Sequence, residues 1–238
     1  MSNDQIAPPP RWHAFLEGRV GAEVAALMVQ LPMLRMQVPR GHGPLMVLPG
    51  FMADDASTWL LRRFLDSIGY AVSAWEMGQN RGPMMAYLSP LIDRLDRLRE
   101  ETGEQPSLVG WSRGGTLSRE IARERPDLVR SVITMGSPVR GGVHGTSIGR
   151  LVASQTGLTP EQINKLLRER QRVPITTPIT ALYSKTDGVV SWQACIDELN
   201  PNVEHVEVGG SHVGLGFSAS VYRRVAGALA SHHGQTQA

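Results

Sequence analysis

Residues 110–114 read Gly-Trp-Ser-Arg-Gly and place Ser112 between two glycines. In the G-x-S-x-G pattern, a serine on a tight strand-to-helix turn projects its hydroxyl above a sheet. Residues 145–149 match the same pattern around Ser147. Only Ser112 follows an apolar, strand-like segment (residues 107–109) and precedes a helix-like one, whereas Ser147 follows a glycine-rich loop. We therefore predict that Ser112 is a nucleophile, with an ordinary turn serine as the alternative.

A serine hydroxyl is a poor nucleophile at neutral pH and needs a neighbouring base. Among seven histidines, His212 fits best, because it follows an alternating segment (residues 203–208) and a Gly-Gly-Ser turn. Catalytic groups in parallel sheets gather at the carboxyl ends of the strands. His144 is the main rival, and a structural or surface histidine is the alternative interpretation of His212.

Asp187 is the candidate acid, because it stands in a turn just after the apolar segment 179–183. An Asp-Gly turn is common for purely structural reasons. The chain order serine, aspartate, histidine nevertheless matches one known order of catalytic triads. The carboxylate would fix the tautomer of the imidazole and stabilise its protonated form. Asp54 and Asp55 are acidic alternatives that suit helix capping or substrate contact better.

Short apolar segments alternate with helical patterns between these residues, which predicts an α/β fold with a mostly parallel central sheet and helices on both faces. The strand-like segments are residues 45–48, 70–75, 107–109, 131–135, 179–183 and 203–208. The helix-like segments are residues 56–68, 84–101, 113–125, 189–199 and 213–230. The most apolar stretch, residues 20–34, is too short to span a bilayer. It is expected to pack as a helix on the domain, with contact to lipid as the alternative.

We predict one domain over residues 12–230, with a disordered tail before it (residues 1–11) and a flexible tail after it (residues 231–238). Residues 139–178 do not fit the alternation of strands and helices. They begin glycine-rich and continue as a helix that Thr159 is expected to cap. Long insertions of this kind are often functional lids, and we interpret this one as a small cap over the active site.

The sequence resembles the α/β-hydrolase family, and most closely its lipase and esterase members with a short cap. The resemblance rests on residues 48–51 (Leu-Pro-Gly-Phe) and 110–114, followed by Asp187 and His212 in that order. It implies the α/β-hydrolase fold and an oxyanion hole that contains the Phe51 amide. The other amide should follow the nucleophile, at Arg113. Many family members have His-Gly where this chain has Pro-Gly, but backbone amides do not require the histidine.

These assignments predict hydrolysis of carboxylic esters through an acyl-enzyme on Ser112, with no metal or organic cofactor. Thioesterase, amidase, C–C hydrolase and acyltransferase reactions use the same triad, and a silent homologue that binds a ligand is a further alternative. The substrate is expected to be a small ester with an apolar acyl part. Several large side chains either line its pocket or belong to the core: Phe51, Trp59, Trp75, Met77, Met84, Met85 and Trp111.

The composition excludes some classes of function. With 24 basic and 22 acidic residues, the formal net charge is only +2, and no basic run suggests a nucleic-acid partner. Cys195 is the only cysteine, so no intrachain disulfide can form. The sequence has no signal-peptide pattern and no transmembrane segment, from which we expect a cytoplasmic protein. It does not indicate the acyl-chain length or the oligomeric state.

Overall fold

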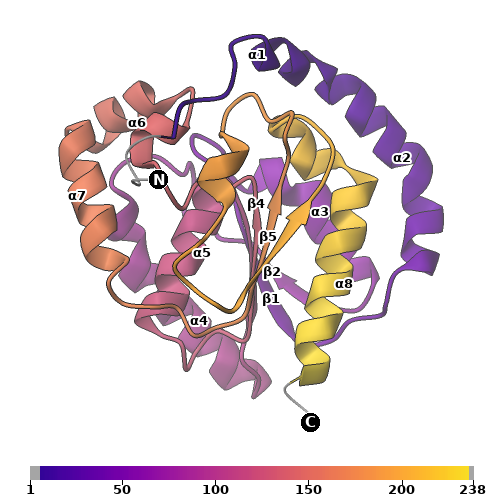
Figure 1. The fold of residues 1–238 in the computed structure, drawn as a ribbon. Coiled ribbons are helices and arrows are strands. Elements are labelled where there is room, and N and C mark those ends of the chain that lie inside the picture. Colours follow the sequence, from indigo (N-terminus) through magenta and orange to yellow (C-terminus); the bar gives the residue numbers. More distant parts are fainter. Residues whose placement is uncertain (1–5, 236–238) are drawn as a thin grey trace.

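A computed structural model describes residues 6–235 of the chain; residues 1–5 and 236–238 lie outside the described part. The chain forms a six-stranded sheet in the order β2-β1-β3-β4-β5-β6, and every neighbouring pair is parallel (Figure 1). The strands are β1 (Pro44–Leu48), β2 (Ala71–Ser73), β3 (Ser107–Trp111), β4 (Val132–Met135), β5 (Ile179–Tyr183) and β6 (Val203–Glu207). Because the strands are parallel, their carboxyl ends meet at one edge.

Helices cover both faces of the sheet, as predicted. Successive residues of a strand point to opposite faces, so each strand contributes to two cores. Val47 and Val109 join one buried cluster with α3 (Asp55–Ser67) and α8 (Ala219–Gln235). Met46 and Leu108 join the other cluster. It includes α4 (Leu88–Thr102) and α5 (Arg113–Glu124). Both faces are therefore closed to water, which explains why β1 and β3 are buried throughout.

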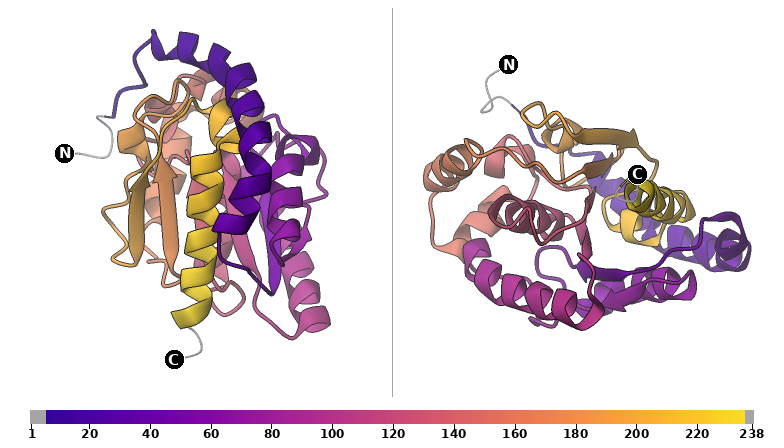
Figure 2. Two further views of the ribbon diagram at one scale, coloured as in Figure 1. Left: turned by 90° about the vertical axis from the view of Figure 1, so that its right-hand side faces the viewer. Right: turned by 90° about the horizontal axis from the view of Figure 1, so that it is seen from below.

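A helical segment at the N-terminus lies outside the layer of helices formed by α3 and α8. It consists of α1 (His13–Leu16), η1 (Glu17–Arg19) and α2 (Val20–Gln37). Helix α2 runs beside α3 and α8 on the side away from the sheet (Figure 2). It buries Leu27, Leu31 and Leu34 in the same cluster as those two helices. The prediction of a helix packed on the domain is thus confirmed for residues 20–34.

Residues 139–178 form a separate helical cap beside α5 (Figure 1). Its elements are η3 (Gly142–Gly145), α6 (Gly149–Thr156) and α7 (Pro160–Arg170). The Thr159 hydroxyl accepts a hydrogen bond from the Gln162 amide, and the Gln162 side chain accepts one from the Thr159 amide. This reciprocal capping box confirms the predicted start of α7.

The helix predicted over residues 189–199 is wrong. Only η4 (Trp192–Cys195) forms there. Backbone groups that a helix would use internally bond elsewhere: the Ala194 carbonyl accepts from the Val139 and Arg140 amides, and the Leu199 amide donates to the Asp197 carboxylate. Asp187 accepts from Val189 and Val190, and the Asp197 side chain accepts hydrogen bonds from the residues that follow it. Such local side-chain bonds compete with helix formation.

Two predicted boundaries also need correction. The last helix begins later than residue 213, because η5 (Val213–Phe217) precedes α8. The predicted flexible tail from residue 231 is wrong for residues 231–235, which belong to α8. His232 bonds to Thr180 and His233 to Arg130, so polar residues that suggested a tail are anchored to the domain.

The predicted N-terminal tail, residues 1–11, is also wrong in part. Residues 6–10 have no regular secondary structure. The Ile6 side chain is nevertheless buried with Val190, Ala194 and Cys195. Burial of an apolar side chain ties this segment to the domain. Residues 1–5 lie outside the described residues.

The short 3-10 helix η2 (Met84–Tyr87) precedes α4, so the segment predicted as one helix over residues 84–101 has two parts. The 3-10 turn tightens the start of the helix where the chain arrives from β2. It places Met84 and Met85 near the carboxyl edge of the sheet, where they line the cavity described below.

Candidate active site

Ser112 occupies a strained turn between β3 and α5. Its φ of 52° and ψ of −122° lie outside the regions that L-residues normally adopt. A Cβ on Gly110 would lie 2.3 Å from the Gly115 Cα, and one on Gly114 would lie 2.3 Å from the Leu48 carbonyl oxygen. Both glycines are therefore required by close backbone packing. The strand–turn–helix context predicted for residues 110–114 is present.

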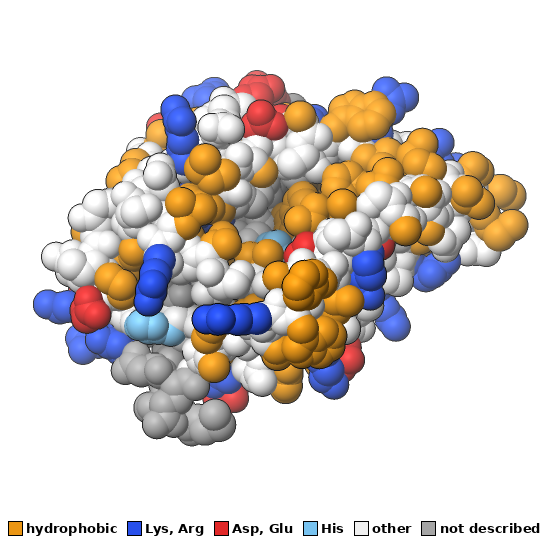
Figure 3. Space-filling view, turned by 90° about the horizontal axis from the view of Figure 1, so that it is seen from above, with side chains coloured by type: hydrophobic (Ala, Val, Ile, Leu, Met, Phe, Trp, Pro, Cys, Tyr) orange, Lys and Arg blue, Asp and Glu red, His pale blue; other side chains and the backbone are white. Residues whose placement is uncertain are grey.

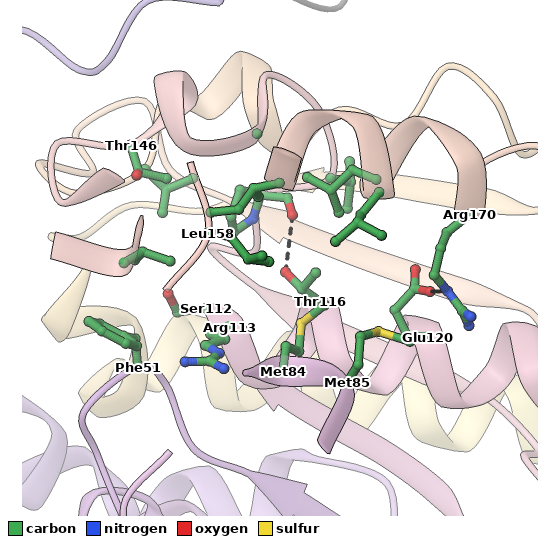
Figure 4. A pocket seen from close by; sticks show the side chains of 18 of the residues that line it. Phe51, Met84, Met85, Ser112, Arg113, Thr116, Glu120, Thr146, Leu158 and Arg170 are labelled. Atoms are coloured by element: carbon green, nitrogen blue, oxygen red, sulfur yellow. Dashed lines mark hydrogen bonds and ion pairs between the residues drawn. The ribbon is translucent and has the colours of Figure 1, made fainter. Parts of the chain in front are cut away.

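The backbone amides of Phe51 and Arg113 lie beside Ser112 and have no acceptor within the described residues. Arg113 is the first residue of α5, where an amide lacks a partner inside the helix. Gly50 lets the loop that carries Phe51 approach Ser112 closely, since a Cβ on Gly50 would lie 3.5 Å from the Ser112 Cβ. The Arg113 guanidinium lies over the Phe51 ring, 5.4 Å from its centroid (Figure 4).

The loop that carries Phe51 is held by a buried asparagine that the sequence analysis missed. The Asn80 side-chain amide donates to the Pro49 carbonyl at 2.8 Å, and the Asn80 backbone carbonyl accepts from the Met52 amide at 2.9 Å. Met52 has a φ of 60°, so the chain turns sharply directly after Phe51. These bonds fix where the Phe51 amide lies relative to Ser112.

His212 and Asp187 form a buried pair, with 2.6 Å between Nδ1 and Oδ2. A carboxylate only accepts hydrogen bonds, so Nδ1 carries the proton and Nε2 is left to act as a base. Burial lowers the pKa of His212, but the charge and hydrogen bond of Asp187 and the charge of Glu17 outweigh it and raise that pKa above its ordinary value. The pair thus favours the protonated imidazole that a general base becomes.

Trp111, the residue before Ser112, links the serine turn to the histidine loop. Its indole nitrogen donates to the His212 carbonyl at 3.2 Å, and the two rings lie 6.4 Å apart between centroids. Within residues 6–235, no hydrogen bond joins the Ser112 hydroxyl to His212. Ser112, Asp187 and His212 thus all lie at the carboxyl edge of the sheet. Asp187 and His212 are hydrogen-bonded to each other, whereas Ser112 and His212 are not.

Gly136 makes room for the acid–base pair and was missed by the sequence analysis. It follows β4 with a φ of 57°. A Cβ there would lie 3.1 Å from the Asp187 Oδ2 and 3.2 Å from the His212 Nδ1, within the range where neighbours must shift. It would also come within 2.7 Å of Leu215. Only glycine fits this position without displacing the pair.

Glu17 of the N-terminal segment binds the loops that carry the acid and the base. Its Oε1 accepts hydrogen bonds from the amides of Gly188 and His212, at 2.9 and 2.8 Å. Its Oε2 accepts from the Val213 amide at 2.9 Å. One carboxylate therefore joins the residue after Asp187 to His212 itself.

Two further side chains of this segment support the same loops. Glu23 accepts from the Ser211 amide at 3.1 Å and from the Ser211 hydroxyl at 2.8 Å. The His13 Nδ1 lies 3.2 Å from the Asp187 carbonyl oxygen. The sequence analysis missed these residues; the available signal was that Glu17 and Glu23 are the only carboxylates of residues 11–40.

The arrangement of the whole chain was compared with known proteins. No family model matches the sequence. A structure described with LipS and LipT, two metagenome-derived lipolytic enzymes, is 14% identical with a TM-score of 0.61 and covers 83% of this chain and 95% of its own. The monoacylglycerol lipase of Paleococcus ferrophilus is 14% identical with a TM-score of 0.60, covering 82% and 96%. Mouse alpha/beta hydrolase domain-containing protein 10 is 20% identical with a TM-score of 0.53, covering 71% and 81%.

The fold is that of the α/β-hydrolases. Identities this low establish a shared fold, and the reaction has to be argued from the site. The predicted fold class and its resemblance are confirmed at this level. The fold also accounts for the position of the candidate site, because the Ser112 turn and the loops that carry Asp187 and His212 follow β3, β5 and β6 at the carboxyl edge.

On this α/β-hydrolase fold, a cavity of about 190 Å³ lies beside Ser112, between α5, η2 and the cap (Figure 4). His212 is not among the residues that line it. The upper face of the molecule is hollowed and bordered by hydrophobic side chains (Figure 3). The lining is mostly apolar and includes Phe51, Met84, Met85, Ile148, Val152, Leu158, Ile163, Leu166, Leu167 and Val190.

The prediction of which large side chains line a pocket is correct only in part. Phe51, Met84 and Met85 line the cavity. Trp75 and Trp111 are buried in the two cores, and Met77 packs against one of them. Trp59 is 53% exposed on α3. Five leucine and isoleucine side chains of the cap also line the cavity: Ile148, Leu158, Ile163, Leu166 and Leu167.

The rival candidates have other roles in this fold. The Ser147 hydroxyl donates to the Gly188 carbonyl in a loop, so Ser147 is not on a strand–helix turn. His144 is exposed in η3. Asp54 caps α3 by accepting from the Ala56 amide at 2.9 Å, which confirms its predicted capping role. Asp55 accepts from two amides after β2, at 3.0 Å each.

One group of possible metal ligands, His42, Glu104 and His233, lies near the C-terminal end of α8. Arg130 occupies this group: its guanidinium bonds to the His233 ring at 2.8 Å and to the Glu104 carboxylate at 2.7 Å. Burial and the Arg130 charge lower the pKa of His233 to about 4. An arginine therefore supplies the positive charge there.

Proposed function

We propose that this chain is a serine hydrolase that cleaves carboxylic esters, with Ser112 as nucleophile, His212 as general base and Asp187 as the acid that orients it. The strained backbone of Ser112 carries the proposal, because such conformations cost about 1–3 kcal/mol and cluster at functional sites. The buried His212–Asp187 pair at the same sheet edge supports it.

The proposed reaction proceeds through an acyl-enzyme. The Ser112 oxygen bonds to the carbonyl carbon while its proton passes to the His212 Nε2, and the carbonyl electrons move to oxygen. Collapse of this tetrahedral species expels the alcohol, which takes the proton from the imidazolium. Water then attacks the acyl group by the same route, and releases the carboxylic acid and free Ser112.

The amides of Phe51 and Arg113 are the proposed oxyanion hole. Both lack an acceptor within residues 6–235 and both flank Ser112. Backbone donors that are already oriented stabilise the developing negative charge without reorganisation, and losing one costs about 10²–10³ in rate. The asparagine bonds that hold the Phe51 loop would provide this preorganisation.

The mechanism requires the Ser112 hydroxyl to turn toward His212. Catalytic hydrogen bonds are often long or unmade in unliganded enzymes and form when substrate binds. The raised pKa of His212, set by Asp187 and Glu17 against its burial, favours accepting the serine proton.

The mostly apolar cavity favours esters with an apolar acyl part, because apolar ligand groups gain free energy on leaving water. Structural neighbours are lipases and carboxylesterases, which is consistent with ester cleavage. Turnover of matched p-nitrophenyl esters, thioesters and anilides would separate esterase from thioesterase and amidase activity. We expect the ester to give the highest kcat/KM, and a preferred thioester or anilide would reassign the substrate class.

A fluorophosphonate probe tests the nucleophile directly. We expect the probe to label the wild type and Ser147→Ala, and to leave Ser112→Ala unlabelled. The Ser147 variant is a matched control, because it removes the serine of the other G-x-S-x-G match. Labelling of Ser112→Ala at the wild-type level would overturn the proposal, as would loss of labelling in Ser147→Ala alone.

A further inference from the structure

The outer side of the N-terminal segment is apolar and uncovered. On α2, Met28, Val29, Met33 and Met36 are 55%, 82%, 65% and 87% exposed, although the inner side of the same helix is buried. In the preceding turns, Trp12 is 58% and Phe15 is 85% exposed. A helix that is apolar all round is normally buried on all sides. The outer side of this one has no partner within the described chain.

These side chains form one continuous surface. Ala22, Val29 and Met36 of α2 follow one another at intervals of seven residues, which places them on one side of the helix, and Phe15 precedes them in α1. Met33 lies between Val29 and Met36. In the view from above, hydrophobic side chains extend from the rim of the hollow to the right-hand edge, the side where α2 lies (Figure 3).

The charges on this surface have one sign. Residues 11–40 contain two acidic side chains, Glu17 and Glu23, and both turn inward to bind backbone amides. Both acidic residues of the segment thus bind backbone amides, and neither is among its exposed residues. The exposed charges are arginines, Arg11, Arg19, Arg35 and Arg40, of which Arg19 lies 3.9 Å from the Glu23 carboxylate.

We infer that the outer surface of residues 11–40 docks on the surface of an anionic lipid bilayer. Apolar side chains would enter the boundary between headgroups and acyl chains, and the arginines would bind lipid phosphates. Within the described residues, no helix is long and apolar enough to cross a membrane. The segment would therefore lie along the lipid surface.

An anionic surface suits this face better than a second copy of the chain does. A two-fold dimer would press the same face of each copy together and bring the arginines of both near one another. Within residues 11–40, Glu23 compensates Arg19 at 3.9 Å, and no exposed carboxylate is present to compensate Arg11, Arg35 and Arg40. Anionic lipid supplies that missing charge, and adds about 1 kcal/mol per arginine near the surface.

The inferred docking would place the candidate active site next to the lipid. Glu17 and Glu23 hold the loops of Asp187 and His212 from the inner side of this segment. The hollow lies on the same face of the molecule as the exposed apolar side chains (Figure 3). This inference is independent of the proposed reaction, since binding to lipid requires no turnover.

Flotation with lipid vesicles tests the inference. The vesicles contain phosphatidylglycerol and phosphatidylcholine in equal amounts, or phosphatidylcholine alone. We expect the wild type to float with the anionic vesicles and at least about tenfold less with the neutral ones. A double variant, Val29→Glu with Met33→Glu, should lose binding by about tenfold or more.

The matched control carries the same change of charge elsewhere. Val173 and Leu199 are each 54% exposed and lie outside the N-terminal segment. The double variant Val173→Glu with Leu199→Glu should float like the wild type. Circular dichroism and fluorophosphonate labelling of each variant would show that fold and site are intact, which separates a failure of docking from a failure of the proposed reaction.

Three results would overturn the inference. The first is a wild type that does not float with anionic vesicles. The second is equal flotation of the Val29→Glu, Met33→Glu variant. The third is a wild-type dimer in light scattering that this variant converts to a monomer without any vesicle binding, which would assign the surface to a second copy.

Discussion

The cap and the N-terminal segment both lie against the candidate site, but they differ in where they direct their apolar side chains. The cap turns Leu158, Leu166 and Leu167 toward the cavity beside Ser112. The N-terminal segment turns Val29 and Met36 to the outside. One segment therefore shapes the space for a substrate, whereas the other leaves its own apolar surface uncovered.

The two segments also differ in how they are held. Arg170 of the cap pairs with Glu120 and Glu124 of α5, so the cap is joined to a helix that is already rigid. Glu17 binds the backbone of the loops that carry Asp187 and His212. We therefore expect changes in the cap to alter substrate binding, and changes at Glu17 to alter the chemical step.

The largest effect is expected from Glu17→Gln. The amide side chain keeps the shape of glutamate but loses its charge, and charged hydrogen bonds are about twice as strong as neutral ones. The loops should become less well positioned, and kcat for a soluble ester should fall about 10–100-fold with little change in KM. Steady-state kinetics would check this. A change confined to KM would contradict the assigned difference between the two segments.

The same variant should move the pH profile. His212 must be neutral to act as a base, so activity falls as the pH drops through its pKa. Asp187 and Glu17 raise that pKa against the effect of burial. Removing the Glu17 charge lowers the pKa of His212, so the acid limb of kcat/KM should move to lower pH. Glu100→Gln on α4 is the control, and an unshifted limb would show that Glu17 acts through structure alone.

The sequence predicted the site where its signals are local. Ser112 was identifiable because its glycines and its flanking strand and helix are neighbours in the chain. Chain order then pointed to Asp187 and His212. Glu17 was not identifiable, because it meets His212 across 195 residues and through a backbone amide, which leaves no mark on residue type.

Glycines mark where the loops of Asp187 and His212 pack closely against the N-terminal segment, but this role can be recognised only from the structure. A Cβ on Gly214 would lie 1.9 Å from the Glu23 Oε2, and one on Gly188 would lie 2.6 Å from the His13 carbonyl oxygen. In the sequence, these look like ordinary loop glycines. The predicted helix over residues 189–199 is wrong for a related reason, because the Ala194 carbonyl accepts from the Val139 and Arg140 amides, which are distant in the chain.

An intermediate effect is expected from Arg170→Met in the cap. This change removes the ion pairs from α7 to α5 while keeping a long apolar side chain. The Glu120 carboxylate keeps Arg123 as a partner, so the loss of stability should be limited to about 1–3 kcal/mol. We expect KM for long-chain p-nitrophenyl esters to rise several-fold, with kcat for short-chain esters unchanged. A fall in kcat for short-chain esters would show that the cap also controls the chemical step.

The smallest effect is expected from Thr159→Ala, which removes one half of the capping box of α7. Loss of such a cap costs about 1 kcal/mol. The cost should fall on the cap alone, because within residues 6–235 no hydrogen bond joins Thr159 to α5 or to the histidine loop. Hydrogen exchange should quicken in residues 160–170 while the amides of residues 211–213 keep wild-type protection. Equal loss of protection in both regions would mean that the cap and the Glu17-bound loops unfold as one unit. Their different attachments would then not give them different free energies of local unfolding.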